Sequence, residues 1–175
     1  MIIGLLAERT KMDQLELSDL ITKLDDKDFH IREQTRYLLI DAGKDAVQLL
    51  IEMLKNSNAH KRWEAVKLLG KIRDKSAADV LVEALTDESM SVHWAASEAL
   101  IGLGAGAILP LLEGLVKHFD SARFRQGAYH ILHMFEHMGH LDSHVQEVLD
   151  ALRDVEPFAT VPWAAERAIE ALTIH

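Results

Sequence analysis

The sequence predicts an all-α solenoid in which five antiparallel helix pairs stack into a right-handed superhelix. Its composition is the first observation behind this prediction. The 175 residues include 26 leucines and 21 alanines, which are strong helix formers, and the first of the three prolines is Pro110. The second observation is a repeat: apolar residues recur at i, i+3, i+4 and i+7 in successive segments, and each segment is one face of an amphipathic helix.

These segments form two interleaved families. The apolar quartets of the first helices span 17–24, 47–54, 78–85, 108–115 and 145–152. Those of the second helices span 35–42, 65–72, 96–103, 128–135 and 165–172. Equivalent positions are 30, 31, 30 and 37 residues apart in the first family and 30, 31, 32 and 37 apart in the second. Such a period predicts stacked helix pairs, each of which buries its apolar face only against its neighbours.

The domain organisation follows from this period. We expect one domain over residues 13–175, with five repeats at about 13–43, 44–74, 75–105, 106–140 and 141–175. Residues 1–12 fall outside the pattern, and we expect their apolar side chains to cover the open end of the first pair. Turn residues agree with the spacing. Residues suited to N-caps and turns follow the first helices at Asp26, Asn56, Asp87, Asp120 and Asp154, and glycines suited to C-caps follow second helices at Gly43, Gly104 and Gly139.

The starts of the second helices resemble a known repeat. The segments 31–35, 61–65, 92–96, 124–128 and 161–165 are similar to the Val-Arg-x-x-Ala signature of HEAT repeats, and more closely to the short phycobilisome-lyase HEAT-like variety. His93 and Pro162 depart from the usual arginine, and about five extra residues separate repeats four and five. The resemblance implies that second helices line a concave surface. It also implies that turn aspartates and the arginines that open second helices bond within and between repeats.

The face of each second helix that points away from its apolar quartet is the candidate binding surface. At 100° per residue, Trp63 lies about 160° from Ala65, and all three tryptophans occupy this repeat position. Exposed tryptophan is a frequent anchor in protein interfaces. We therefore predict a concave binding face made of Trp63, Lys67, Lys71, Trp94, Glu98, Trp163, Arg167 and Glu170. The alternative is that each indole packs along the neighbouring second helix.

Ten histidines are many for this length, and five of them lie at 130, 133, 137, 140 and 144. Gly139 is expected to end the helix, which leaves His130, His133 and His137 on one exposed arc. Imidazoles at i and i+4 can chelate Zn²⁺, Ni²⁺ or Cu²⁺, so this stripe is a candidate metal site. The alternative is a solvated polar face. The His-Glu dipeptides with which deoxyhypusine hydroxylase holds iron do not occur in this sequence.

Composition and motifs restrict the function. The absence of cysteine excludes disulfides and thiol catalysis, and no nucleotide-binding, serine-hydrolase or zinc-protease motif is present. Residues 76–175 contain 5 Lys and Arg against 15 Asp and Glu, which opposes nucleic-acid binding. No export signal or apolar run of about 20 residues is evident, so we expect a cytoplasmic chain without membrane contact.

The leading prediction is therefore a non-enzymatic scaffold that binds a protein or peptide, with no cofactor. The resemblance to phycobilisome-lyase subunits implies an alternative, in which the chain helps an enzyme to attach or detach a bilin or a similar chromophore. A histidine-rich metal-binding protein is the third prediction, with Zn²⁺ or Ni²⁺ as the bound ion.

Overall fold

The computed structural model describes residues 12–154 and 156–174, and these residues form an all-helical protein without strands. The predicted capping segment at residues 1–12 lies outside the described residues except for Met12, whose side chain packs against the core.

In the described residues, ten α-helices alternate as first and second members of five pairs. The first helices are α1 (Gln14–Lys23), α3 (Lys44–Met53), α5 (Ala78–Glu83), α7 (Ile108–Lys117) and α9 (Ser143–Leu152). The second helices are α2 (Phe29–Ala42), α4 (Ala59–Ile72), α6 (Met90–Leu103), α8 (Ala122–His137) and α10 (Pro157–Thr173). Short 3₁₀ segments flank α5 and precede α7: η1 (Lys75–Ala77), η2 (Ala84–Thr86) and η3 (Gly104–Ala107). Each quartet lies in or directly beside its helix, so the predicted helix pairs are confirmed.

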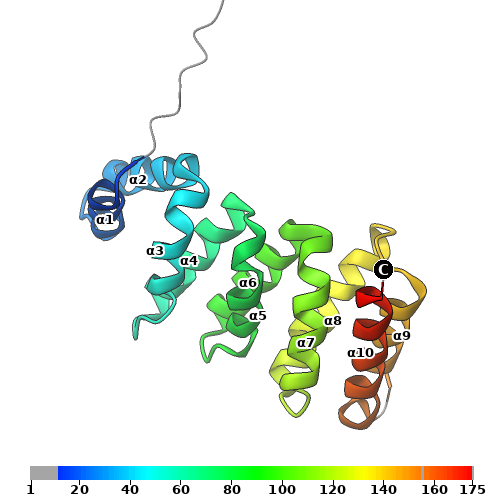
Figure 1. Cartoon of the computed structure of the whole chain (residues 1–175). Helices are drawn as coiled ribbons and strands as arrows, with labels where there is room; N and C mark the ends of the chain where they lie inside the picture. The colour runs from blue at the N-terminus through cyan, green and yellow to red at the C-terminus, as the bar shows by residue number, and fades with distance from the viewer. Residues whose placement is uncertain (1–11, 155, 175) are drawn as a thin grey trace, which may run out of the picture.

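The first four pairs stack in two layers (Figure 1). The second helices α2, α4, α6 and α8 contact one another in chain order, and we call this row the second layer. The first helices α1, α3, α5 and α7 form the first layer, in which α3 meets the start of α5 through η1. The predicted α-solenoid is therefore confirmed.

The fifth pair departs from this order. A regular stack would place α9 next to α7, but α10 occupies that position and packs against both α7 and α9 (Figure 1). Helix α9 in turn contacts α8 of the second layer. The prediction that every second helix lines one surface is wrong for α10. As a result Trp163, Arg167 and Glu170 do not share a face with the tryptophans of α4 and α6.

The connection into the fifth pair is what permits this exchange. Only Gly43 separates α2 from α3, whereas the five residues 138–142 separate α8 from α9. Five residues reach at most about 18 Å, roughly twice the 8–10 Å between packed helix axes. The chain can therefore leave α8 without entering the next first-layer position.

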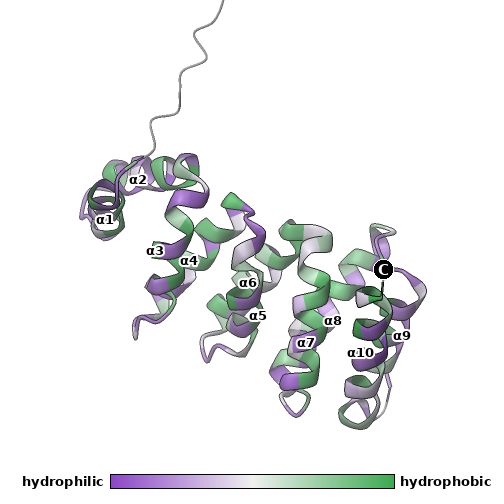
Figure 2. Ribbon diagram, in the orientation of Figure 1, coloured by the Kyte–Doolittle hydropathy of each residue, from purple (hydrophilic) through white to green (hydrophobic). Residues whose placement is uncertain are grey.

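The core lies between the two layers and is made of the quartet residues. Leu39, Leu69, Leu81, Leu100 and Leu111 are among its fully buried members. Figure 2 shows apolar stripes on the helices alternating with polar faces. Alanines complete the interfaces where helices approach closely. A Cβ atom added at Gly70 of α4 would lie 2.8 Å from the Cβ of Ala99 on α6.

The residues that cap the starts of α2 and α4 differ from those that the sequence suggests. The N-caps of α2 and α4 are Asp28 and Asn58, whose side chains accept hydrogen bonds from the backbone N–H groups of His30 and His60. Asp26 and Asn56 instead accept from the N–H two residues later and close Asx turns before these caps. Glycine C-caps are confirmed at Gly43 and Gly104, and Gly139 follows α8, all three with positive φ.

Arginines at the start of second helices close the turns in front of them. Arg62 donates to the carbonyls of Asn56 and Ser57, and its guanidinium also forms two hydrogen bonds, of 2.7 and 2.9 Å, with the Asp87 carboxylate of the next repeat. These bonds confirm the pairing implied by the HEAT resemblance. They also raise the pKa of Arg62. Burial raises the pKa of Asp87, but the bonds from Arg62 and from the Ser89 N–H outweigh it, so that this pKa is lowered.

The third repeat has His93 where this arginine would stand. His93 is fully buried, and its Nδ1 lies 2.8 Å from the Leu85 carbonyl oxygen. The turn carbonyls of Asp87 and Glu88 instead accept hydrogen bonds from Arg123 of α8, at 2.8 and 2.9 Å. The next repeat thus supplies the guanidinium that the third repeat lacks.

One helical stretch of the described residues, Met90–Lys117, is long and apolar enough to cross a membrane by length and composition, with a hydropathy of 1.9. The expectation that no stretch reaches this length is therefore wrong, because Glu98 is the single Asp, Glu, Lys or Arg residue between Val92 and Leu112. In the fold, Gly104 at φ 67° divides the stretch into α6 and α7 of different repeats.

Candidate functional site

The exposed face of α4 carries one tryptophan and two lysines on consecutive turns. Trp63, Lys67 and Lys71 are four residues apart, so they lie above one another on one side of the helix. Trp63 is half-buried, and its indole stacks on the His60 imidazole with ring centroids 5.6 Å apart. The Lys67 ammonium lies 5.8 Å from the Trp63 ring centroid, within cation–π range. The stripe combines a fixed aromatic surface with exposed positive charge.

Grooves run along both sides of this stripe. One lies between α2 and α4 and has a volume of about 400 Å³, and the other lies between α4 and α6 and has a volume of about 370 Å³. Lys67 and Lys71 line both, so we treat them as one surface, the α4 groove. Its lining includes Arg36, Tyr37, Trp63, Glu64, Lys67, Lys71, Arg73 and Glu98.

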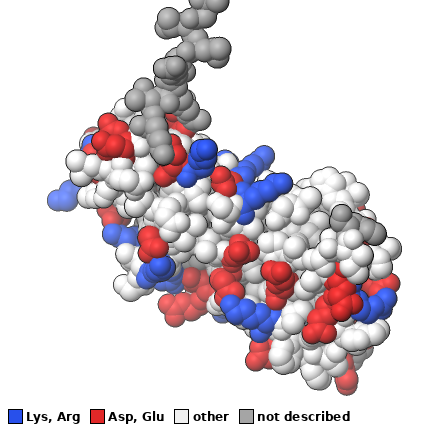
Figure 3. Space-filling view, in the orientation of Figure 1, with Lys and Arg blue, Asp and Glu red and all other residues white. Residues whose placement is uncertain are grey.

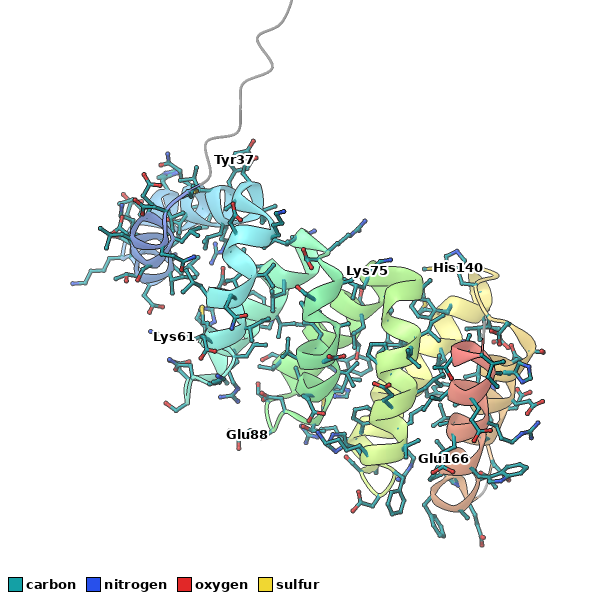
Figure 4. All side chains as sticks on the ribbon, in the orientation of Figure 1. Tyr37, Lys61, Lys75, Glu88, His140 and Glu166 are labelled. Carbon is teal, nitrogen blue, oxygen red and sulfur yellow. The ribbon has the colours of Figure 1, made fainter. Side chains whose placement is uncertain are left out.

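The carboxylates of the α4 groove are already engaged within the protein. Glu64 is 5% exposed and pairs with Arg36, which also binds Glu33. Glu98 lies 3.4 Å from His130 Nε2 on α8, and its side chain is 71% exposed. Four basic side chains line the groove, Arg36, Lys67, Lys71 and Arg73, against the three acidic ones, Glu33, Glu64 and Glu98, so its excess charge is positive. Figure 3 shows basic side chains gathered at the upper edge of the middle of the molecule, where Figure 4 labels Lys75.

Among the groove residues named above, Glu33, Arg36, Tyr37, Glu64 and Arg73 were not predicted from the sequence. Tyr37 of α2 is 71% exposed and stands at the far wall (Figure 4). Arg73 is the C-cap of α4 and is left-handed, with φ 58° and ψ 32°, and the equivalent Gly43 and Gly104 also have positive φ but a different ψ. A signal for Arg73 is visible in the sequence, because a non-glycine residue stands at a repeat position that needs positive φ.

The predicted row of tryptophans is only partly assembled. Trp94 of α6 is 38% exposed, and its ring meets that of His130 on α8 edge to face at 5.3 Å. This contact matches the alternative that indoles pack along the neighbouring second helix. Trp163 is 63% exposed on α10, where the Arg167 guanidinium lies 4.8 Å from its ring centroid. Glu170, also on α10, is exposed.

The histidine stripe is divided as well. His130 contacts Trp94 and Glu98, whereas His133 and His137 contact each other, with their Nε2 atoms 3.2 Å apart. Helix α8 ends at His137, and Gly139 follows with φ 69°, so His140 leaves the arc (Figure 4). In the described part of the chain, no three histidine or acidic side chains converge on a point that could hold a metal ion. The structure does not bring the three predicted ligands together.

A polar cluster joins α8 to α9 beside these histidines. Glu136 accepts hydrogen bonds from Arg153 at 2.7 Å and from Gln146 at 2.9 Å, and it lies 3.2 Å from His133 Nδ1. Arg153 and then Gln146 lower the pKa of Glu136 to about 2. This carboxylate is therefore charged throughout the neutral range.

The repeats of the first half match a known family. Residues 17–101, which contain α1 to α6 apart from the first turn of α1 and the end of α6, match the family described as HEAT repeats. This part of the chain is similar to HEAT repeats, which are in general protein-interaction scaffolds. The residues that line the α4 groove lie on α2, α4 and α6 and at the C-cap of α4.

Other comparisons are more distant. The crystal structure of an engineered protein from the Northeast Structural Genomics Consortium is similar at 19% sequence identity, with a TM-score of 0.45, and the match covers 91% of this chain and 80% of that chain. No curated protein matches the chain.

Proposed function

We propose that this protein is a binding module that holds an acidic segment of a partner protein in the α4 groove. The segment would present carboxylates to Lys67, Lys71 and Arg73 and an apolar side chain to Trp63. The observation that carries this proposal is the Trp63, Lys67 and Lys71 stripe. All three side chains line the groove between α2 and α4, and both lysines also line the groove between α4 and α6.

The tryptophan and the lysines contribute to binding in different ways. Trp63 is held by the core and by His60, so little conformational entropy is lost when a partner covers it. Lys67 and Lys71 are exposed basic side chains, which favour a partner of opposite sign and rapid encounter. Trp163 and Arg167 lie on α10 and take no part in this groove.

The test uses fluorescein-labelled peptides of matched length, one rich in Asp, Glu and Leu and one rich in Lys and Leu. We expect anisotropy to show saturable binding of the acidic peptide alone, weaker at higher salt. Lys67→Ala with Lys71→Ala should weaken binding by about tenfold or more, which corresponds to about 1.4 kcal/mol. Lys55→Ala with Lys117→Ala is the matched control, because it removes equal charge from the ends of first-layer helices. Equal loss in both double variants would contradict the proposal.

A bilin is the second candidate ligand, because the resemblance to phycobilisome-lyase HEAT-like repeats implies chromophore handling. A bilin carries two propionate groups, and two lysines one helical turn apart beside an indole offer partners for both propionates and for the conjugated rings. Titration of biliverdin into the protein would then change the visible absorption spectrum, and the Lys67→Ala and Lys71→Ala double variant would abolish the change. An unchanged spectrum removes this candidate and leaves the peptide proposal intact.

A further inference from the structure

The end of α8 places two imidazoles in an arrangement that a metal ion would require. His133 and His137 are four residues apart, and their Nε2 atoms are 3.2 Å from each other. Two nitrogens bound to Zn²⁺ at 2.0–2.1 Å with a tetrahedral angle would be about 3.4 Å apart. The two rings are thus already at nearly the spacing of a chelate, with centroids 4.5 Å apart and an interplanar angle of 75°.

The surroundings of His133 set its tautomer. Its Nδ1 lies 3.2 Å from Glu136 Oε2, and a carboxylate is an acceptor, so Nδ1 carries the hydrogen and Nε2 keeps its lone pair. Tyr129 stacks on the other side of the ring, nearly parallel at 9° with centroids 5.5 Å apart. The His133 Nε2 lone pair then accepts a hydrogen bond from His137 Nε2–H, and a metal ion bound to both Nε2 atoms would replace this hydrogen, which moves to His137 Nδ1.

Glu136 is itself held in place from the next helix. Arg153 Nη2 and Gln146 Nε2 both donate to it, at 2.7 and 2.9 Å. A carboxylate that orients a ligating histidine and is in turn fixed by hydrogen bonds is the usual outer shell of a zinc site. This outer shell comes from α9, so it depends on the contact between α8 and α9.

We propose that His133 and His137 form a two-imidazole site for a divalent late transition metal ion, Zn²⁺, Ni²⁺ or Cu²⁺, with Glu136 as the residue that positions His133. His137 is exposed, so the remaining coordination positions open to water. His130 is not a ligand, because its ring packs on Trp94 and its Nε2 faces Glu98. The site is independent of the α4 groove and of its proposed partner.

The test is calorimetric titration of the tag-free full chain with ZnCl₂ and with NiCl₂. We expect one ion per chain, and we expect His137→Ala to weaken binding by at least tenfold. His130→Ala is the matched control, since it removes an imidazole from the same exposed arc, and its affinity should equal that of the unchanged protein. Absence of saturable binding would overturn the proposal, as would an equal loss in both variants, which would indicate diffuse binding along the stripe.

A second measurement tests the role of Glu136. Glu136→Gln should weaken metal binding by about ten- to a hundredfold, in line with outer-shell substitutions at zinc sites. Circular dichroism establishes whether α8 remains folded, and electron paramagnetic resonance of the Cu²⁺ complex counts the bound nitrogens. Two nitrogens in the unchanged protein and one in His137→Ala would support the chelate, whereas an equal number in both would contradict it.

Discussion

The junction between α4 and α6 and the junction of the fifth pair with the rest of the stack are held in different ways. Between α4 and α6 the backbones approach closely at Gly70 and Ala99, and the nearly buried Arg62 and Asp87 pair between the two repeats. At the fifth pair, Arg153 at the end of α9 pairs with Glu136 of α8, and these side chains are more exposed, at 37% and 30%. The same helical period therefore produces interfaces of unequal specificity.

This difference explains why the fifth pair can depart from the stack. The apolar faces of α9 and α10 can be buried whichever of the two helices lies beside α7, because each face needs only an apolar neighbour. In the regular part of the stack, the bond from Arg62 to Asp87 joins the turn of the second repeat to the turn of the third. In this register the arginine that would pair with the fifth repeat is Arg125 of the fourth, and it donates to the Phe119 carbonyl of its own turn. The five-residue connection then provides the reach for the other order.

The largest expected effect comes from breaking the Arg62–Asp87 ion pair between the second and third repeats. Asp87→Ala leaves the Arg62 guanidinium nearly buried without its carboxylate, and its side chain is only 10% exposed. We expect the free energy of unfolding to fall by about 3 kcal/mol or more. Arg153→Ala, which breaks the more exposed pair with Glu136 across the junction of α8 and α9, should lower the free energy of unfolding by much less. Urea denaturation measures both, and equal losses would show that the two junctions do not differ.

The contribution of the Arg62–Asp87 ion pair to stability should also depend on pH. Because the folded protein lowers the pKa of Asp87, its stabilising contribution is present above the unfolded value of about 3.9 and is lost as pH falls through the folded pKa. Asp87→Asn keeps the shape of the side chain but removes this titration. The stability difference between Asp87→Asn and the unchanged protein should therefore be largest near pH 7 and should shrink below about pH 4. Urea midpoints at a series of pH values test this, and a constant difference would refute it.

Much of the fold could be predicted from sequence, because helix identity depends on local apolar spacing. The helix pairs and the glycines that end α2 and α6 follow from that spacing and from positive φ. The placement of α10 could not be predicted, because it depends on which apolar face α7 meets, and the amphipathic pattern of α9 and α10 is the same in both orders. The extra residues before α9 were the one visible signal.

The candidate site, too, could be predicted from the sequence only in part. Trp63, Lys67 and Lys71 lie on one helix, so their common face could be derived from helix geometry. Tyr37 and Arg73 reach the α4 groove from a neighbouring helix and from a cap, and a single-helix argument does not place them there. For the same reason, the contact of His130 with Glu98, which removes His130 from the metal site, required the structure.

A smaller effect tests how closely α4 and α6 must approach. In Gly70→Ala the new Cβ would lie 2.8 Å from Ala99 Cβ and 3.1 Å from its Cα, so the helix backbones must separate. We expect a net loss of about 1 kcal/mol, because overpacking costs about 1–3 kcal/mol and alanine returns about 1 kcal/mol of helix propensity.

Gly102→Ala is the matched control for this close approach, since the nearest atom to its Cβ would be Arg73 Nε at an ordinary 3.6 Å, with Arg73 Nη2 and the Gly70 carbonyl oxygen at 3.9 Å. It should stabilise the protein by up to about 1 kcal/mol. Thermal and urea unfolding distinguish the two variants. Stabilisation by both substitutions would mean that the interface between α4 and α6 has room for an added methyl group. It would then be less specific than the comparison with the fifth pair implies.

The smallest expected effect is spectroscopic and concerns which tryptophans share a surface. One variant retains only Trp63, with Trp94→Phe and Trp163→Phe, and the other retains only Trp163, with Trp63→Phe and Trp94→Phe. Trp163 is 63% exposed, whereas Trp63 is half-buried, so we expect Trp163 to emit at the longer wavelength and to be quenched more by acrylamide. The acidic peptide should protect Trp63 from quenching and leave Trp163 unaffected, because α10 lies beside α7 and not beside α8 in the second layer. Equal protection of both indoles would place α10 on the binding face and would restore the single row of tryptophans that the sequence predicts.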